Sequence, residues 1–214
     1  YHHQDSKISA LLGECGLKLA SRIGVLTTLI GALVACAAPA VEVTRSQPLT
    51  FASGEDFLNP NLTGDRMLAY LTGYSFWDNT PPGSAAIARP VIHRQAGGIG
   101  TYADPITLAV GHRIVGSVQT LDFPAGTRFY FPELRRYAIV EDVCGDGPTP
   151  QNGPCHIGYN GLPWLDIYVG GETVEASVSH ACMYSITRVH QVICDPSPGY
   201  PVIAGPLTET GCAV

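Results

Sequence analysis

The chain has 214 residues, of which 45% are hydrophobic and 14% charged, and it is long enough for one sizeable core but not for two full domains. Its 24 glycines and 17 prolines favour many turns and short strands over long helices. The formal net charge is -6 and the largest basic cluster is the pair Arg135 and Arg136, which excludes the basic surface that a nucleic-acid partner requires.

The first feature along the chain is an N-terminal segment, residues 1–40, that contains an apolar run. Lys18 and Arg22 precede this run, which ends in small residues, so the pattern is that of a secretory signal with cleavage expected after Ala40. A lipoprotein signal with Cys36 as the lipidated residue is the alternative. The run is shorter than the ~20 residues of a membrane span. We therefore expect a secreted, extracellular protein, with a lipid-anchored bacterial envelope protein as the alternative.

The mature chain divides into three parts. Residues 41–66 form a polar lead-in. From residue 67 to 170, short apolar segments such as PITLAV, GTRFYF, RYAIVEDV and LDIYVGG alternate with Gly and Pro turns, which predicts an all-β fold of the small barrel or sandwich type. Residues 171–214 contain two β-like runs, TVEASVSHACMYSI and RVHQVIC, and are predicted to be a Cys-containing β extension of the barrel.

Five cysteines follow the predicted cleavage site, and export favours disulfides for them. The short intervals predict the pairs Cys144–Cys155 and Cys182–Cys194, with Cys212 as the odd residue. The alternative is a metal site with two nitrogen and two sulfur ligands, from His180, Cys182, His190 and Cys194. No C-x-x-C pair supports it, so we expect no metal and no other cofactor.

The stretch PWLDIYVGGE places one carboxylate inside a run that is typical of a buried strand. Successive side chains of an extended chain point to opposite faces, so Leu165 and Ile167 share one face while Trp164, Asp166 and Tyr168 share the other. We expect the first face to be core and the second to line an exposed groove, where aromatic rings stack on a sugar beside the acid. The alternative is an aspartate at a sheet edge or at the cap of a turn.

Two further aspartates stand beside strand or turn signals. They are Asp78 in YSFWDNTPPGS and Asp142 in IVEDVCGD. Cleavage of a glycosidic bond needs one protonated and one ionised carboxyl group, so both are candidate catalytic residues together with Asp166. Trp77 and Tyr102 join the aromatic candidates for substrate binding. The alternative is that Asp78 starts an Asx turn and that Asp142 ends a strand beside a disulfide-bearing turn.

The order DPITLAV, FPAGTRFYFPELRRYAIVEDVCGD, LDIYVGG resembles the double-psi β-barrel superfamily, which includes expansins, family 45 endoglucanases, lipoprotein A-like barrels and the three-aspartate domain of lytic transglycosylases. The resemblance covers about half of the chain. It implies a six-stranded double-psi β-barrel over residues 67–170 with a disulfide-stapled C-terminal extension.

The resemblance also implies roles for individual acids. Asp104, Asp142 and Asp166 look like the three acids of the superfamily, and Asp166 takes the position of the general acid. FWDN looks like the motif that carries the base in family 45 endoglucanases, which gives that role to Asp78. Two departures are that Trp164 stands where the superfamily has a histidine, and that NTPPGS replaces the cysteine cluster after the base.

Two functions follow as hypotheses. The first is a secreted enzyme that cleaves a β-1,4-linked polysaccharide, either by inverting hydrolysis with Asp166 and Asp78 or as a lytic transglycosylase with one acid. The second is a non-catalytic, expansin-like wall-loosening protein, in which Trp77, Trp164 and Tyr168 bind by stacking. A structural barrel with purely architectural acids is a third reading. We expect a monomer whose partner is a cell-wall polysaccharide, with no membrane contact unless Cys36 is lipidated.

Overall fold

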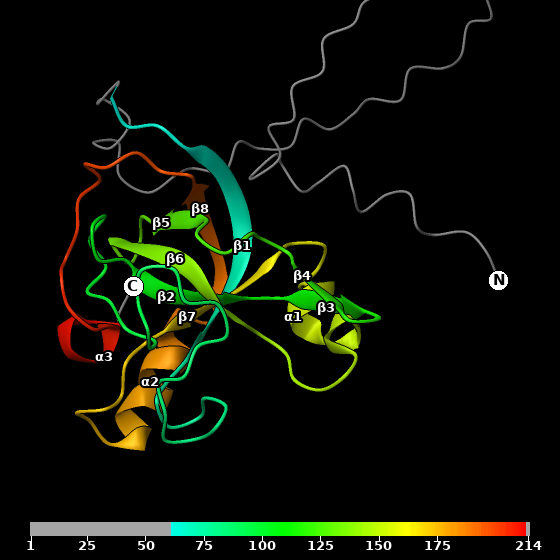
Figure 1. Ribbon diagram of the computed structural model, residues 1–214. Helices are drawn as coiled ribbons and strands as arrows, with labels where there is room; N and C mark the ends of the chain where they lie inside the picture. Colours follow the sequence, from blue (N-terminus) through cyan, green and yellow to red (C-terminus); the bar gives the residue numbers. More distant parts are fainter. Residues whose placement is uncertain (1–60, 213–214) are drawn as a thin grey trace, which may run out of the picture.

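The computed structural model describes residues 61–212, which form a barrel with short helices around it (Figure 1). The predicted secretory signal, Cys36 and most of the polar lead-in lie outside the described residues. In chain order the elements are β1 (Asp65–Tyr74), β2 (Ile106–Val110), β3 (His112–Val115), β4 (Val118–Leu121), β5 (Arg128–Phe131), β6 (Arg136–Val143), η2 (Pro150–Asn152), α1 (Pro154–Ile157), β7 (Trp164–Tyr168), α2 (Ala176–Ile186), β8 (Arg188–Cys194) and α3 (Leu207–Thr210). Among these elements, no helix is long and apolar enough to cross a membrane.

Six strands close into a barrel in the order β1-β7-β2-β6-β5-β8, which confirms the predicted closed six-stranded barrel. The pairs β1–β7 and β2–β6 are parallel, and the other neighbours are antiparallel. Closure leaves no unpaired edge in the main sheet. Strands β3 and β4 form a separate hairpin that projects from the side of the barrel (Figure 1).

The predicted boundary at residue 170 is wrong, because the sixth barrel strand lies beyond it. The run RVHQVIC forms β8, which pairs with β1 and β5 and so closes the barrel. The run TVEASVSHACMYSI, predicted as β, forms helix α2 instead. Its buried residues Ser179, Cys182 and Ile186 are three and four positions apart, which is the spacing of one helix face. Its Val, Thr and Tyr residues favoured a strand only as a local preference.

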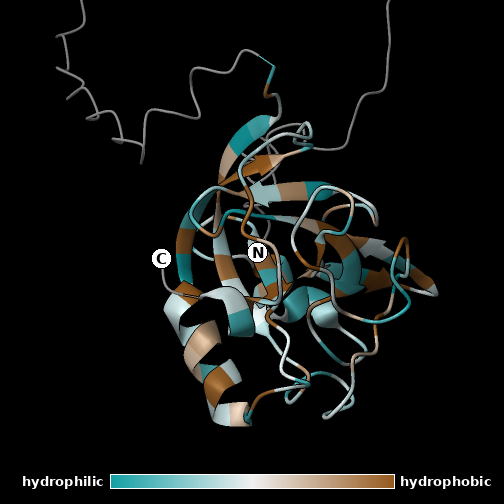
Figure 2. Ribbon diagram, turned by 90° about the vertical axis from the view of Figure 1, so that its left-hand side faces the viewer, coloured by the Kyte–Doolittle hydropathy of each residue, from teal (hydrophilic) through white to brown (hydrophobic). Residues whose placement is uncertain are grey.

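The barrel interior is filled by fully buried apolar side chains, among them Leu71, Leu108, Phe129, Val140, Leu165, Ile167 and Val192. Figure 2 shows bands of hydrophobic and hydrophilic residues following one another along the strands, as the period of two requires. Each such side chain contributes roughly 1.5–3 kcal/mol through burial. On the outside, Gly73 of β1 lets α2 approach closely, because a Cβ there would lie 3.1 Å from Ile186 Cδ1.

One of the two predicted disulfides is confirmed and the other is wrong. Cys144 pairs with Cys155. Cys182 pairs with Cys212 rather than with Cys194, which belongs to another disulfide. After α2, strand β8 runs away from the helix for seven residues, roughly 20 Å, and carries Cys194 to the far end of β1. The cysteines proposed as metal ligands are therefore both engaged in disulfides.

Candidate functional site

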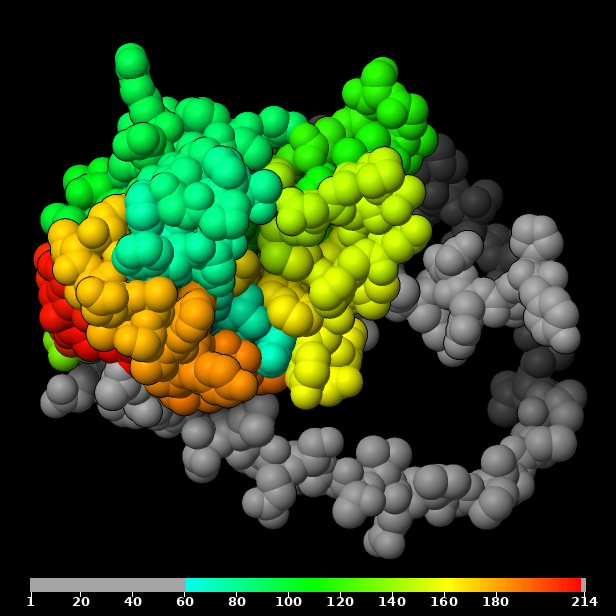
Figure 3. All heavy atoms as spheres, turned by 90° about the horizontal axis from the view of Figure 1, so that it is seen from below, coloured from blue at the N-terminus to red at the C-terminus, as the bar shows by residue number. Residues whose placement is uncertain are grey.

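The three predicted catalytic aspartates line one cavity of about 410 Å³. Its wall consists of Tyr74, Asp78, Asn79, Thr80, Ala86, Ile87, Ala88, Ala109, Asp142, Val143, Cys144, Gly145, Asp146 and Asp166. Seen from below, the loop after β1 and the segment after β6, teal and yellow-green in Figure 3, lie on either side of a recess. The fold thus gathers acids from three segments that are far apart in the sequence.

The floor of this cavity is set by strand register. Ala109 of β2 is the register partner of Asp166 on β7 and of Asp142 on β6, so the small alanine lies between the two acids. The β2–β6 register shifts between Leu108 and Ala109, and the extra residue in β6 is Glu141. A bulge of this kind re-aims the side chains that follow it. Here it brings Asp142 into line with Asp166 and leaves room between them.

Asp166 has the most perturbed environment of the three acids. Its Oδ1 accepts a hydrogen bond from Thr72 Oγ1 at 2.6 Å, and Thr72 Oγ1 accepts one from Trp164 Nε1 at 2.7 Å. Burial raises the pKa of Asp166 to about 7, with a smaller contribution from the charges of Asp78 and Asp142, while the Thr72 hydrogen bond acts in the opposite direction. The carboxyl group is therefore poised to hold and release a proton near neutral pH.

Asp142 is buried and held by three donors. Its Oδ1 accepts from the backbone N–H groups of Ala88 and Val143 at 3.0 and 2.9 Å, and its Oδ2 accepts from the Tyr74 hydroxyl at 3.0 Å. Burial raises its pKa, and these hydrogen bonds oppose the rise. Because it ties the 86–88 wall to β6, Asp142 shapes the cavity.

Asp78 lies at the exposed rim of the cavity. Its Oδ1 accepts from the backbone N–H and the hydroxyl of Ser75 at 2.7 and 2.6 Å. These contacts with Ser75 agree with the alternative prediction that Asp78 has a local, turn-forming role. The same contacts hold the carboxylate at the cavity, so the two readings are compatible.

Two of the predicted sugar-binding aromatics support the site from behind. Trp164 is half-buried, and its ring centroid lies 4.7 Å from that of Tyr70 in an edge-on arrangement. Its indole N–H group donates to Thr72 Oγ1. Tyr168 is 3% exposed and its hydroxyl donates to Glu172 Oε1 at 2.6 Å. Leu165 and Ile167 face the core as predicted. On the opposite face of β7, Trp164 and Tyr168 pack against neighbouring residues and donate hydrogen bonds within the protein. Tyr168 is therefore not part of an exposed groove.

The other two aromatic candidates lie apart from each other. Trp77 is 39% exposed beside Asp78 at the rim, and its Nε1 donates to the Val174 carbonyl at 3.1 Å. Tyr102 packs edge-on against Tyr137 at 5.3 Å and beneath the Arg128 guanidinium, away from the residues that line the cavity. None of the four predicted aromatic residues lines the cavity, and Trp77 is the exposed one that directly precedes the rim residue Asp78.

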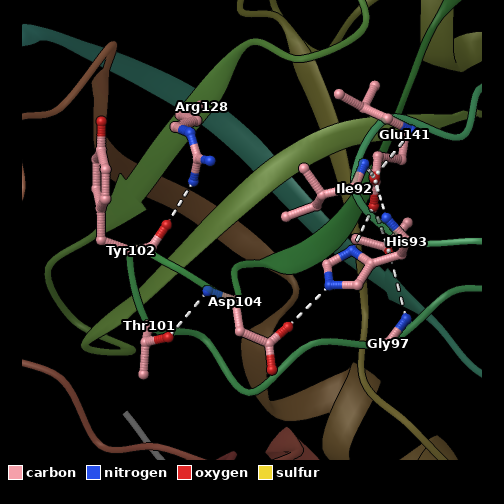
Figure 4. A network of polar contacts seen from close by, with 10 residues as sticks. Ile92, His93, Gly97, Thr101, Tyr102, Asp104, Arg128 and Glu141 are labelled. Carbon is pink, nitrogen blue, oxygen red and sulfur yellow. Dashed lines mark hydrogen bonds and ion pairs between the residues drawn. The ribbon is translucent and has the colours of Figure 1, made fainter.

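Asp104, assigned to the acid triad by resemblance, lies in a different cluster (Figure 4). Its Oδ1 is 2.8 Å from His93 Nε2, and His93 Nδ1 is 2.6 Å from Glu141 Oε2. Both ring nitrogens face carboxylate oxygens, and a neutral imidazole has only one N–H to donate. The geometry therefore fits the positively charged ring. Although burial acts in the opposite direction, the hydrogen bonds to Asp104 and Glu141 raise the pKa of His93.

Glu141 is the anchor of this cluster, which the sequence analysis did not identify. It is fully buried, and its Oε1 accepts from the backbone N–H groups of Val91, Ile92 and His93 at 2.7–3.1 Å. Burial acts to raise the pKa of Glu141, but the backbone N–H groups of His93 and Ile92 together with the His93 ring outweigh it and lower the pKa. The available signal was an acidic residue directly after the apolar run YAIV of the strand RYAIVEDV. Glu141 and its neighbour Asp142 together fix the loop that walls the cavity.

The fold and the cavity define a class, a small closed β-barrel protein with a cavity lined by acidic residues. The chain belongs to the family described as the DDB_G0273701 N-terminal domain, whose match covers residues 67–213 and so begins within β1 and includes every later barrel strand. A Dictyostelium discoideum relative, "Uncharacterized protein DDB_G0273701/DDB_G0273221", is 33% identical over 132 residues, which are 62% of this chain and 52% of the relative. The chain thus spans about half the length of that relative. No solved structure matches this chain significantly.

Proposed function

We propose that the protein is a secreted, polysaccharide-active double-psi β-barrel protein in which Asp166 acts as the general acid on a β-1,4-linked glycan. The observation that carries the proposal is the partly buried Asp166 in an open cavity, with a pKa of about 7, beside two further aspartates. A carboxyl group that keeps its proton near neutral pH can donate it to a glycosidic oxygen.

The barrel topology supports the double-psi assignment. The closed sheet contains two parallel pairs, β1–β7 and β2–β6, among antiparallel neighbours. Asp142 and Asp166 lie on strands that flank β2, so the motifs that carry the resemblance meet at one cavity. Asp104 does not support the resemblance in the same way, because it pairs with His93.

The roles that we propose for the acids follow from their different environments. Asp166 donates the proton, and Asp78, at the exposed rim, activates water on the opposite side of the sugar. Inverting hydrolysis requires the two carboxyl groups to be roughly 6.5–9.5 Å apart. Asp142 positions the cavity wall through its three hydrogen bonds. A lytic transglycosylase would need Asp166 alone, since a hydroxyl of the sugar then attacks.

A non-catalytic, expansin-like function is the second candidate, and an aromatic surface favours it. Tyr159 is 41% exposed and stacks on Tyr70 at 4.2 Å, while Trp164 meets Tyr70 edge-on. An exposed ring held rigidly in this way provides a flat surface for a pyranose. Binding without cleavage would then depend on Tyr159 and Trp77 rather than on Asp166.

The test is product release from β-1,4-glucan, chitin and peptidoglycan by the wild type and by Asp166→Asn. We expect the wild type to cleave one of these polymers and Asp166→Asn to lose at least 100-fold in rate while still binding the polymer. Asp146→Asn, which changes an exposed acid on the same cavity, is the matched control and should retain activity. Mass spectrometry of the products separates hydrolysis, which leaves reducing ends, from transglycosylation, which leaves anhydro ends. Binding without any product would contradict the enzyme proposal and favour the expansin-like one.

A further inference from the structure

A second cavity, of about 470 Å³, lies between the β3–β4 hairpin and the segment around α1. It is lined by Arg113, Thr120, Leu121, Asp122, Phe123, Cys155, His156, Ile157, Gly158, Gly161, Leu162 and Pro163. Figure 1 shows β3, β4 and α1 together on one side of the barrel. The two cavities share no lining residue, but the Cys144–Cys155 disulfide joins their walls, since Cys144 lines the first and Cys155 the second. The second cavity is thus a separate site with a covalently fixed wall.

The walls of the second cavity are mainly apolar. Leu121, Phe123, Leu162 and Pro163 contribute to them, and Ile157 is 66% exposed. The volume falls within the range of roughly 300–1,000 Å³ that is typical of small-molecule sites, which combine apolar walls with a few polar groups. A ligand with an apolar body would remove Ile157 from water.

The polar groups of this cavity favour an anion. His156 Nδ1 lies 2.6 Å from Asp122 Oδ1, so the acid already has a partner. Its other oxygen lies against Gly111, where an added Cβ would be 2.3 Å from Oδ2. Arg113 forms no ion pair and no side-chain hydrogen bond within residues 61–212. Burial raises the pKa of Asp122, and the Arg113 charge, acting through space, helps to oppose this larger effect. The N–H donors of Arg113 make no hydrogen bond to the described residues, so they can bind the carboxylate of a ligand in a bidentate manner.

We propose that the second cavity binds a small organic acid that has one carboxylate and an apolar, aromatic or short aliphatic body. The carboxylate pairs with Arg113, and the body packs between Leu121 and Ile157. A cationic ligand would be repelled by the Arg113 guanidinium, and Oδ1 of Asp122 already faces His156. An uncharged ligand of the same shape would leave Arg113 without a partner.

The test is a titration of the full chain, followed by amide NMR shifts, with three probes of matched shape: 3-phenylpropionate, 3-phenylpropionamide and 3-phenylpropylamine. We expect saturable shifts at Arg113, His156 and Ile157 with the carboxylate, and affinity at least tenfold weaker for the amide and the amine. Arg113→Gln should weaken carboxylate binding about tenfold and leave amide binding unchanged. Ile157→Ser should weaken both.

Arg94→Gln, which changes another exposed arginine outside the cavity, is the control and should bind like the wild type. Equal affinity for carboxylate and amide, or undiminished carboxylate binding by Arg113→Gln, would overturn the proposal. So would the lack of saturable shifts at the cavity with every probe. The amide spectrum of each variant reports at the same time whether it is folded, and Ile157→Ser tests the site independently because Ile157 is exposed.

Discussion

Thr72 on β1 is the register partner of Asp166 on β7, and its hydroxyl group donates to Asp166 Oδ1 at 2.6 Å. The indole N–H of Trp164 donates to the same hydroxyl oxygen at 2.7 Å, so the Thr72 hydrogen is directed toward the acid. With Oδ1 already accepting this hydrogen bond, a proton on neutral Asp166 is placed on Oδ2. Trp164, predicted to stack on sugar, instead orients the hydroxyl that orients the acid.

Replacing Thr72 by Val should raise the pKa of Asp166 above 7, because the Thr72 hydrogen bond favours the ionised form. The alkaline limb of the activity profile, which reports the acid, should therefore move to higher pH. Thr72→Ser keeps the hydroxyl group and should restore the wild-type profile. An unchanged pH profile in Thr72→Val would show that this hydroxyl does not tune the acid.

The unfolding free energy of the protein should depend on pH through the titration of Asp166. Its folded pKa of about 7 lies above the ordinary value of 3.8, so the folded state binds more protons between these two values. This stabilisation is present below about pH 4 and is lost as the pH rises through 7. Relative to the wild type, Asp166→Asn should thus gain up to about 4 kcal/mol in unfolding free energy between pH 4 and pH 8. Urea unfolding at both pH values measures the difference, and a pH-independent difference would contradict the assignment.

His93 should give a stability change of its own. Its folded pKa is raised, so its stabilising effect is present below the unfolded value of 6.5 and is lost as the pH rises through the folded pKa. We expect His93→Gln to destabilise the protein by about 1–2 kcal/mol at pH 5.5 and by less at pH 9. His180→Gln, at an exposed position, serves as the control. Equal losses at both pH values would mean that the ring charge makes no contribution.

The disulfide assignment can be checked directly. Non-reducing peptide mapping should recover Cys182 linked to Cys212, and no peptide that links Cys182 to Cys194. The Cys182–Cys212 bond spans 30 residues, so its removal in Cys212→Ser should cost about 3 kcal/mol in unfolding free energy. The double variant with Cys182→Ser should lose no more than the single one, because either change removes the same bond.

The sequence by itself determined the features that depend on neighbouring residues. The period of two in PWLDIYVGG placed Leu165 and Ile167 in the core and Asp166 on the other face, and the short interval from Cys144 to Cys155 identified a real pair. Such features follow from local geometry, because alternation along a strand and a short chain between two cysteines need no knowledge of the rest of the fold.

The tertiary structure decided the features that depend on which segments meet. Strand β8 closes the barrel and carries Cys194 away from Cys182, although the two are close in sequence. The extra residue at Glu141 aligns Asp142 with Asp166. Asp104 instead pairs with His93, away from the cavity that contains these two acids. These outcomes depend on register and on hydrogen-bond partners supplied by distant strands. A residue type and its spacing therefore indicate that an acid is present, but only packing determines which donors surround it and whether it keeps its proton.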